Sequence, residues 1–142
     1  MMTQRHVEQL SRGACAELLR ESSVGRIVFV DKDGPAALPV NYGLAGDDII
    51  FRIEQQSNLR GLLKGPVAFE VDHMVPEADS GWSVLVRGTP QEVPIDEVPG
   101  FVKQMKETLP RPWAEGVHNV WVAIKPREVT GRKLTGTFIA AL

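Results

Sequence analysis

The chain has 142 residues, a net charge of −2 and an isoelectric point of about 5.9. This length suits a single domain that buries its core without disulfides or structural metal ions. The weakly acidic balance argues against a nucleic-acid-binding protein, which usually presents a basic face. We therefore expect one globular domain that spans residues 1–142.

The sequence shows no targeting or membrane signal. Cys15 is the single cysteine, so no intrachain disulfide can form, which fits a reducing compartment. The N-terminal residues have no apolar signal core, and no apolar run approaches the length of a membrane span. These observations predict a cytoplasmic protein that binds neither membranes nor nucleic acids.

The first third of the chain predicts a helix followed by two strands. Ser11 is a favourable helix cap, and Leu10 is placed to pack against Cys15 one turn later. Residues 25–30 (GRIVFV) and 36–42 (which end in ALPVNY) are strand-like runs around the hairpin signal Asp33-Gly34. Pro39 indicates an edge, or a position whose amide is not needed for pairing.

The stretch from residue 49 to residue 72 predicts a strand, a short helix and another strand. Residues 49–53 suit a pleated, half-buried surface. Ser57 then precedes leucines at helical spacing, and Gly65-Pro66 ends that helix. As a helix cap, Ser57 has two interpretations: it closes a helix that only packs, or it opens an anion site on free backbone amides.

The second half predicts more antiparallel strands. Residues 73–81 read as a loop, and residues 82–88 as a strand that continues to residue 93 past a bend or bulge at Gly88. Residues 94–109 carry a helix whose face includes Phe101, Met105 and Leu109. Residues 118–124 form the last long strand. Six or seven antiparallel strands with two or three short helices indicate a β-barrel or sandwich.

Familiar catalytic and metal-binding patterns are missing from the sequence. The three histidines are far apart, and no HxxxH, CxxC, G-x-S-x-G or phosphate-binding glycine loop is present. His73 lies next to Asp72 and close to Glu70, which allows either a ligand cluster or a solvated loop histidine. If the protein is an enzyme, its chemistry is expected to come from a cofactor.

Several separated motifs, in order, carry a resemblance to a known family. They are residues 25–53 (GRIVFVDKDGPAALPVNYGLAGDDIIFRI), 57–72 (SNLRGLLKGPVAFEVD), 81–93 (GWSVLVRGTPQEV) and, more loosely, 121–134 (WVAIKPREVTGRKL). Together they resemble the pyridoxamine 5′-phosphate oxidase-like flavoproteins, small bacterial members above all. The resemblance implies a mainly β fold, a six-stranded antiparallel split β-barrel, and a homodimer with FMN, or a deazaflavin coenzyme in its place, bound between subunits.

The resemblance also implies which residues bind the cofactor. The second strand would line the flavin ring, the third would flank the ring and its ribityl chain, and the turn after it would meet the phosphate. Trp82 and Ser83 would close over the site from the partner subunit. Trp121 and Arg132 would approach it from the last strand. The cofactor-binding residues implied are Pro39, Val40, Asn41, Phe51, Arg52, Ile53, Ser57, Asn58, Leu59, Trp82 and Ser83. No catalytic side chain and no metal ligand are assigned.

Asn58 departs from the family pattern, which usually has a basic residue there. Arg60 lies two residues further on, about 200° around a helix, and need not replace it. Pyridoxamine phosphate oxidase itself carries an Arg-x-His substrate segment near its C-terminus. This segment is missing here, which argues against pyridoxamine phosphate oxidation. The leading hypothesis is a flavin- or deazaflavin-dependent oxidoreductase that transfers a hydride to or from a small organic substrate. The alternatives are a non-catalytic protein that binds flavin, haem or another planar ligand, and an interaction module without a ligand.

Overall fold

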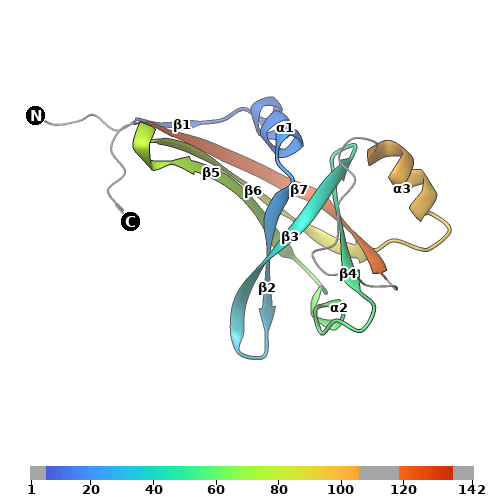
Figure 1. Cartoon of the computed structure of the whole chain (residues 1–142). Helices are drawn as coiled ribbons and strands as arrows, with labels where there is room; N and C mark the ends of the chain where they lie inside the picture. Colours follow the sequence, from blue (N-terminus) through green and yellow to red (C-terminus); the bar gives the residue numbers. More distant parts are fainter. Residues whose placement is uncertain (1–5, 106–118, 136–142) are drawn as a thin grey trace, which may run out of the picture.

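The computed structural model describes residues 6–105 and 119–135, which form seven strands and four short helices (Figure 1). The elements in chain order are β1 (His6–Gln9), α1 (Arg12–Glu21), β2 (Val24–Asp31), β3 (Gly34–Ala45), β4 (Asp48–Glu54), α2 (Leu59–Leu62), β5 (Val67–Val75), the 3-10 helix η1 (Pro76–Ala78), β6 (Ser80–Glu92), α3 (Val98–Met105) and β7 (Asn119–Thr135).

Six of the strands close into a barrel, as the sequence predicts. The sheet order is β1-β7-β4-β3-β2-β5-β6, and β6 pairs with β7 as well, so β2 to β7 form a closed ring with every pair antiparallel. Because the ring is closed, each of these six strands has a hydrogen-bonded neighbour on both sides over part of its length. The fold is a mainly β split barrel.

The barrel interior is filled by alternate residues of each strand. Ile27, Phe51, Phe69, Val84 and Ile124 are each fully buried there. The helix α1 covers one end: Ser11 caps it by accepting the amide of Ala14, as expected, and the Tyr42 hydroxyl donates to the carbonyl of Leu19. Cys15 is a buried core residue whose thiol pKa is raised by desolvation.

A second, smaller cluster lies outside the barrel wall, where α3 packs. Ile50 and Met105 are its buried centre, with Phe101 and Trp121 packed against them. The expected helical face is therefore confirmed for Phe101 and Met105, whereas Leu109 and His118 lie outside the described residues.

Three elements differ from the sequence predictions. The strand β1 was not expected, because its four exposed residues show no alternation and it forms only by pairing with β7. The predicted loop at 73–81 is mostly strand, with a short turn at η1. The last strand runs on to Thr135 through a bulge: Arg87 lies opposite Glu128 and Gly88 opposite Pro126, so Arg127 of β7 is the extra residue.

Candidate functional site

The strands β3 and β4 diverge beside three of the predicted ligand residues. Within the described residues, β3 pairs with β4 only over Tyr42–Ala45, whereas it pairs with β2 along its whole earlier length. Pro39, Val40 and Asn41 therefore lie on β3 at positions that have no β4 partner. Val40 packs against the barrel core, so alternation places Pro39 and Asn41 on the outer face. Pro39 therefore lies at a local edge of the sheet, as expected: it pairs with β2 on one side and has no β4 partner on the other.

The next three predicted residues, on β4, divide between two faces. Phe51 is fully buried and Ile53 nearly so, both in the barrel interior. Arg52 points to the outer face, where its guanidinium lies 5.0 Å from the centre of the Trp121 ring. Burial lowers the pKa of Arg52, although an arginine stays charged at neutral pH. Arg52 is thus a half-buried cation beside Trp121, close to the strand divergence, whereas Phe51 and Ile53 face the barrel interior.

The turn after β4 holds the predicted phosphate end. The Ser57 hydroxyl accepts the amide of Leu59 at 3.1 Å, and Leu59 itself is buried. The helix α2 has only four residues and begins after Asn58, one residue later than a cap at Ser57 predicts. The Ser57 hydroxyl therefore accepts a backbone amide at the start of the helix, as the predicted cap would, although the helix itself begins only at Leu59. So short a helix has almost no dipole, and Ser57 offers a hydroxyl rather than a full helix terminus.

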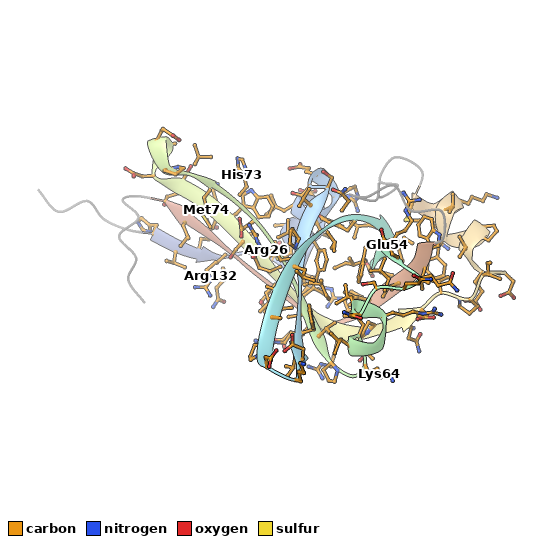
Figure 2. All side chains as sticks on the ribbon, turned by 60° about the horizontal axis from the view of Figure 1, so that its bottom comes forward. Arg26, Glu54, Lys64, His73, Met74 and Arg132 are labelled. Carbon is orange, nitrogen blue, oxygen red and sulfur yellow. The ribbon has the colours of Figure 1, made fainter. Side chains whose placement is uncertain are left out.

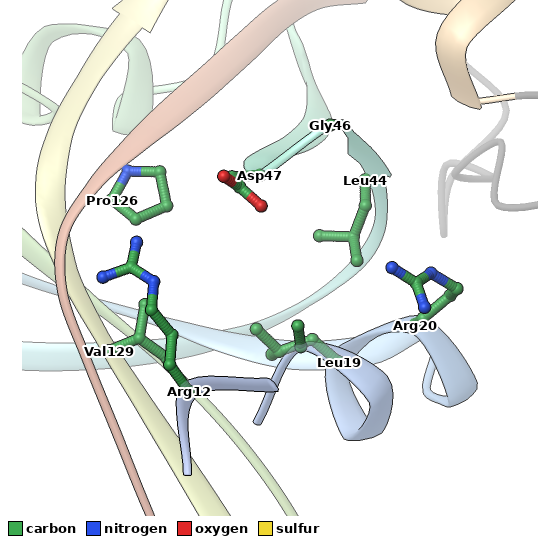
Figure 3. A pocket seen from close by; sticks show the side chains of 9 residues that line it. Arg12, Leu19, Arg20, Leu44, Gly46, Asp47, Pro126 and Val129 are labelled. Carbon is green, nitrogen blue, oxygen red and sulfur yellow. The ribbon is translucent and has the colours of Figure 1, made fainter. Parts of the chain in front are cut away.

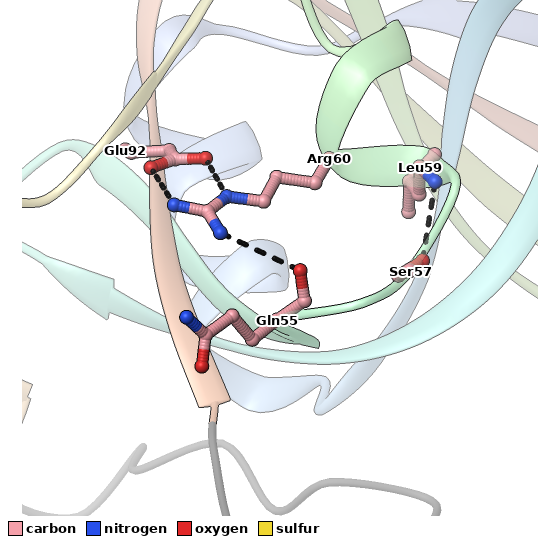
Figure 4. A network of polar contacts seen from close by, with 5 residues as sticks. All are labelled: Gln55, Ser57, Leu59, Arg60 and Glu92. Carbon is pink, nitrogen blue, oxygen red and sulfur yellow. Dashed lines mark hydrogen bonds and ion pairs between the residues drawn. The ribbon is translucent and has the colours of Figure 1, made fainter.

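Arg60 is held away from the Ser57 turn by a bidentate ion pair (Figure 4). Its Nε donates to Glu92 Oε1 at 2.6 Å and a terminal nitrogen donates to Oε2 at 3.1 Å, while another reaches the carbonyl of Gln55 at 3.5 Å. The arginine lowers the pKa of Glu92. This exposed pair links α2 to the end of β6, and it occupies the guanidinium of Arg60, the basic residue nearest in sequence to Asn58.

Trp82 and Ser83 lie at the opposite end of β6 from this turn. Ser83 is nine residues from Glu92, which is about 30 Å along a strand. Figure 2 shows the same separation: Glu54 and Lys64, on either side of the Ser57 turn, lie far from Met74 and Arg132. Trp82 packs on the barrel core near His73, with ring centres 6.5 Å apart. One chain therefore does not bring all eleven predicted residues together.

A groove of about 460 Å³ lies beside Ser83, on the face formed by β1, β6 and β7. We call it the β1–β6–β7 groove. Its polar lining is Gln9, Ser83, Thr130 and Arg132, and Val7 and Leu85 contribute apolar surface. Sequence reasoning named Ser83 and Arg132 but missed Gln9 and Thr130, because β1 and the second half of β7 were not recognised as strands.

A smaller cavity of about 40 Å³ lies between α1 and the β3–β4 turn (Figure 3). Leu19, Leu44 and Val129 give it an apolar wall, and Arg12 and Arg20 rise from α1 at either side. Its volume is well below that of ordinary ligand sites, so we assign it no ligand.

An ionic cluster occupies the outer face of β2 and β5. The Arg26 guanidinium contacts Asp72 at 3.0 Å and Glu70 at 3.4 Å. Desolvation and the neighbouring Asp72 raise the pKa of Glu70 to about 7, because a single arginine serves two carboxylates. His73 follows Asp72 on the strand and so points to the opposite face. Within the described ranges, no group of three histidine, cysteine or acidic side chains is placed to hold a metal ion.

The raised pKa of Glu70 predicts a pH-dependent stability. The folded protein binds this proton more tightly than the unfolded chain, so the free energy of unfolding falls as pH rises from about 4.5 to about 7. We expect Glu70→Gln to stabilise the protein by about 1–2 kcal/mol at pH 8 and to be nearly neutral at pH 4.5. Urea unfolding at both pH values measures this. Glu128→Gln, at an exposed carboxylate paired with Arg87, is the control. An equal effect at both pH values would contradict the assignment.

No helix in the described part of the chain is both long and apolar enough to cross a bilayer.

With this geometry in place, comparisons with known proteins identify relatives. An uncharacterised protein of Mycobacterium tuberculosis is 31% identical over 136 residues, which cover 92% of this chain and 87% of that protein. The structure of an FAD-binding protein from Mycobacterium smegmatis has 27% identity and a TM-score of 0.74, over 89% of this chain and 98% of the other. An FAD- and haem-binding protein of the same species has 18% identity and a TM-score of 0.71, over 94% and 76%, and shows the fold alone.

The sequence match extends over almost every element described above. A family model described as pyridoxamine 5′-phosphate oxidase matches residues 11–133, from the cap of α1 to the groove strand β7. Because this match includes the whole barrel and both groups of predicted ligand residues, the chain belongs to the pyridoxamine 5′-phosphate oxidase family.

Proposed function

We propose that this protein is a flavin-dependent oxidoreductase that transfers a hydride to or from a small organic substrate. FMN is the proposed cofactor, with a deazaflavin coenzyme as the alternative. The observation that supports the proposal is the divergence of β3 from β4. Pro39–Asn41 lie on β3 where it has no β4 partner, Arg52 lies on β4 next to the last paired residue Phe51, and the Ser57 turn follows the end of β4. The FAD bound by the Mycobacterium smegmatis relative supports a flavin there.

The proposed site needs two copies of the chain, because Trp82 and Ser83 lie about 30 Å along β6 from the Ser57 turn. A second copy that presents its own Trp82 and Ser83 would complete the site, and we propose a homodimer. Exposed apolar residues on the strands support an apolar interface: Val7, Val24 and Met74 are 61%, 45% and 42% exposed in the single chain. The lone reduced cysteine fits a cytoplasmic location.

The residues present fit a flavin ring better than they fit its phosphate. Pro39 on the outer face of β3 and Trp82 of a second copy would supply apolar surface, and the outer edge of β3 would supply backbone groups for a planar heterocycle. At the phosphate end, Arg52 and the Asn58 amide would bind the phosphate, because Arg60 is ion-paired with Glu92. When bound, the flavin supplies the hydride chemistry. The chain itself would hold the ring, exclude water and place the substrate.

A second candidate function is flavin or haem binding without catalysis. Two observations favour it: Asn58 stands where a basic residue is usual, and the nearby Arg60 is held by Glu92 rather than facing the Ser57 turn. A protein of this kind would hold the ligand and show no turnover.

The first test is a spectrum and a titration. We expect the purified protein to be yellow, or to rise in melting temperature with FMN, FAD or the deazaflavin. A ligand at one hundred times its Kd adds about 2.7 kcal/mol to stability. Turnover with a reduced nicotinamide donor then separates the enzyme from the binding protein. Haem is added to the same titration, and a colourless protein that neither these coenzymes nor haem stabilises would reject both functions.

A matched set of variants tests the phosphate position. Aspartate accepts a backbone amide as well as serine does, so Ser57→Asp keeps the turn and adds a negative charge. We expect FMN affinity to fall by about tenfold or more, with Ser57→Asn as the neutral control. Asn58→Lys should tighten FMN binding by about tenfold. Flavin fluorescence measures each Kd, and unchanged affinity in both charge variants would place the phosphate elsewhere.

A further inference from the structure

The β1–β6–β7 groove has a polar row built across three strands. Arg132 on β7 lies directly opposite Gln9 on β1 and directly opposite Ser83 on β6. Directly opposed residues have Cβ atoms about 5 Å apart and share a face of the sheet. The row therefore places a guanidinium between an amide and a hydroxyl, all three of which line the same groove. Thr130, two residues earlier on β7, adds a second hydroxyl.

The charge of Arg132 is not neutralised by the described part of the chain. Arg26, Arg60 and Arg87 each pair with a carboxylate, whereas Arg132 makes no ion pair among the described residues. None of the described residues that line the groove is acidic. Glu8 precedes Gln9 on β1 and Lys133 follows Arg132 on β7. Because successive side chains alternate along a strand, both point to the opposite face of the sheet. The groove is thus a site of net positive charge whose polar groups can all donate hydrogen bonds.

Apolar surface borders this row on both sides. Leu85 lies opposite Thr130, and Val7 lies opposite Leu134, each one step along the same face. The volume of about 460 Å³ falls within the range of sites for small organic molecules. An arginine fork with neighbouring donors is the usual recognition of a carboxylate or phosphate.

We propose that the β1–β6–β7 groove binds a small organic anion through its carboxylate or phosphate group, with Arg132 as the charged ligand and Gln9, Ser83 and Thr130 as hydrogen-bond donors. The anion belongs to a second molecule, the substrate of the proposed oxidoreductase, and in that respect the inference rests on the proposed function. The flavin phosphate is assigned to the Ser57 turn, about 30 Å along β6 within one chain.

Binding of a model anion to the full chain tests the groove without any flavin. Isothermal titration with benzoate, its neutral analogue benzamide and inorganic phosphate gives the affinities. We expect benzoate to bind the wild-type protein and benzamide to bind far more weakly. Arg132→Gln should raise the Kd for benzoate at least tenfold, and Arg132→Lys should raise it less, because the charge remains without the fork. Arg127→Gln removes the same charge from an exposed position on β7 outside the groove, and should leave the Kd within twofold.

Three results would overturn the proposal: equal binding of benzoate and benzamide, unchanged benzoate affinity in Arg132→Gln, or an equal loss in Arg127→Gln. A flavin titration then distinguishes the source of the anion. If Arg132→Gln weakens FMN but not riboflavin, and benzoate displaces FMN, the groove holds the flavin phosphate and the second-molecule assignment fails. If benzoate binds through Arg132 while no flavin binds, the groove stands as an anion site and the proposed function fails.

Discussion

Replacing Phe69 by alanine is expected to lower the free energy of unfolding by about 3–5 kcal/mol. Phe69 is fully buried on β5 and lies at the centre of the aromatic core. Its ring meets Tyr42 edge-on at 5.1 Å and stacks near Phe51 at 6.3 Å. Truncation would leave a cavity that a closed barrel cannot collapse, because all six strands are paired. Chemical denaturation at a fixed protein concentration measures the loss.

Gly25 gives this prediction a sharper form. A Cβ added at Gly25 would lie 2.3 Å from Phe69 Cε1 and 2.5 Å from Cζ, so the ring occupies the space that a side chain would take. We expect Gly25→Ala to destabilise the wild-type protein by about 1–3 kcal/mol and to cost clearly less in the Phe69→Ala background. Additive effects in this double-mutant cycle would contradict the close contact between the two residues.

Gly88→Ala is expected to destabilise the protein by about 3 kcal/mol. The glycine follows the bulge at which β6 shifts register against β7. A Cβ there would lie 2.2 Å from the Lys125 carbonyl oxygen and 2.9 Å from Ile124 Cγ2. The first of these atoms belongs to the backbone, so the strands themselves would have to separate. We expect the melting temperature to fall by roughly 6–12 °C.

A second glycine supplies the control for Gly88. Gly13 lies in the first turn of α1, and a Cβ there meets no atom within 4 Å. Gly13→Ala should therefore leave stability unchanged or raise it by up to about 1 kcal/mol, since alanine favours helix. If Gly88→Ala proved as harmless as Gly13→Ala, the close approach of β6 to β7 would be wrong.

Some elements were predictable because their signals are local. The cap at Ser11, the turn at Asp33-Gly34 and the alternation along β2 each depend on residues a few positions apart. The irregularity at Gly88 was also recognisable, because a glycine inside a strand pattern often marks one, although the extra residue of the bulge is Arg127 on β7. These signals do not need the rest of the fold, so the sequence reveals them.

Other elements exist only through distant partners. The strand β1 has no pattern of its own and is a strand because Thr135 and its neighbours pair with it. The second half of β7 reads as a proline-containing tail, and it is a strand because it pairs with β6 on both sides of the bulge at Arg127. The helix α2 is shorter than its leucine spacing suggests, since the backbone leaves the helical region at Leu63, before Gly65-Pro66. Pairing and turn geometry decided each of these.

For the candidate site, the sequence determined which residues to consider, through separated motifs that identify a family and its split barrel. Only the tertiary structure decided where they lie. It buries Phe51 and Ile53 in the core, holds Arg60 on Glu92, and places Ser83 about 30 Å along β6 from the Ser57 turn. It also brings Gln9 beside Arg132. The physical reason is that the sequence specifies which side chains are present, whereas the pairing of strands in the closed barrel determines which side chains lie next to one another.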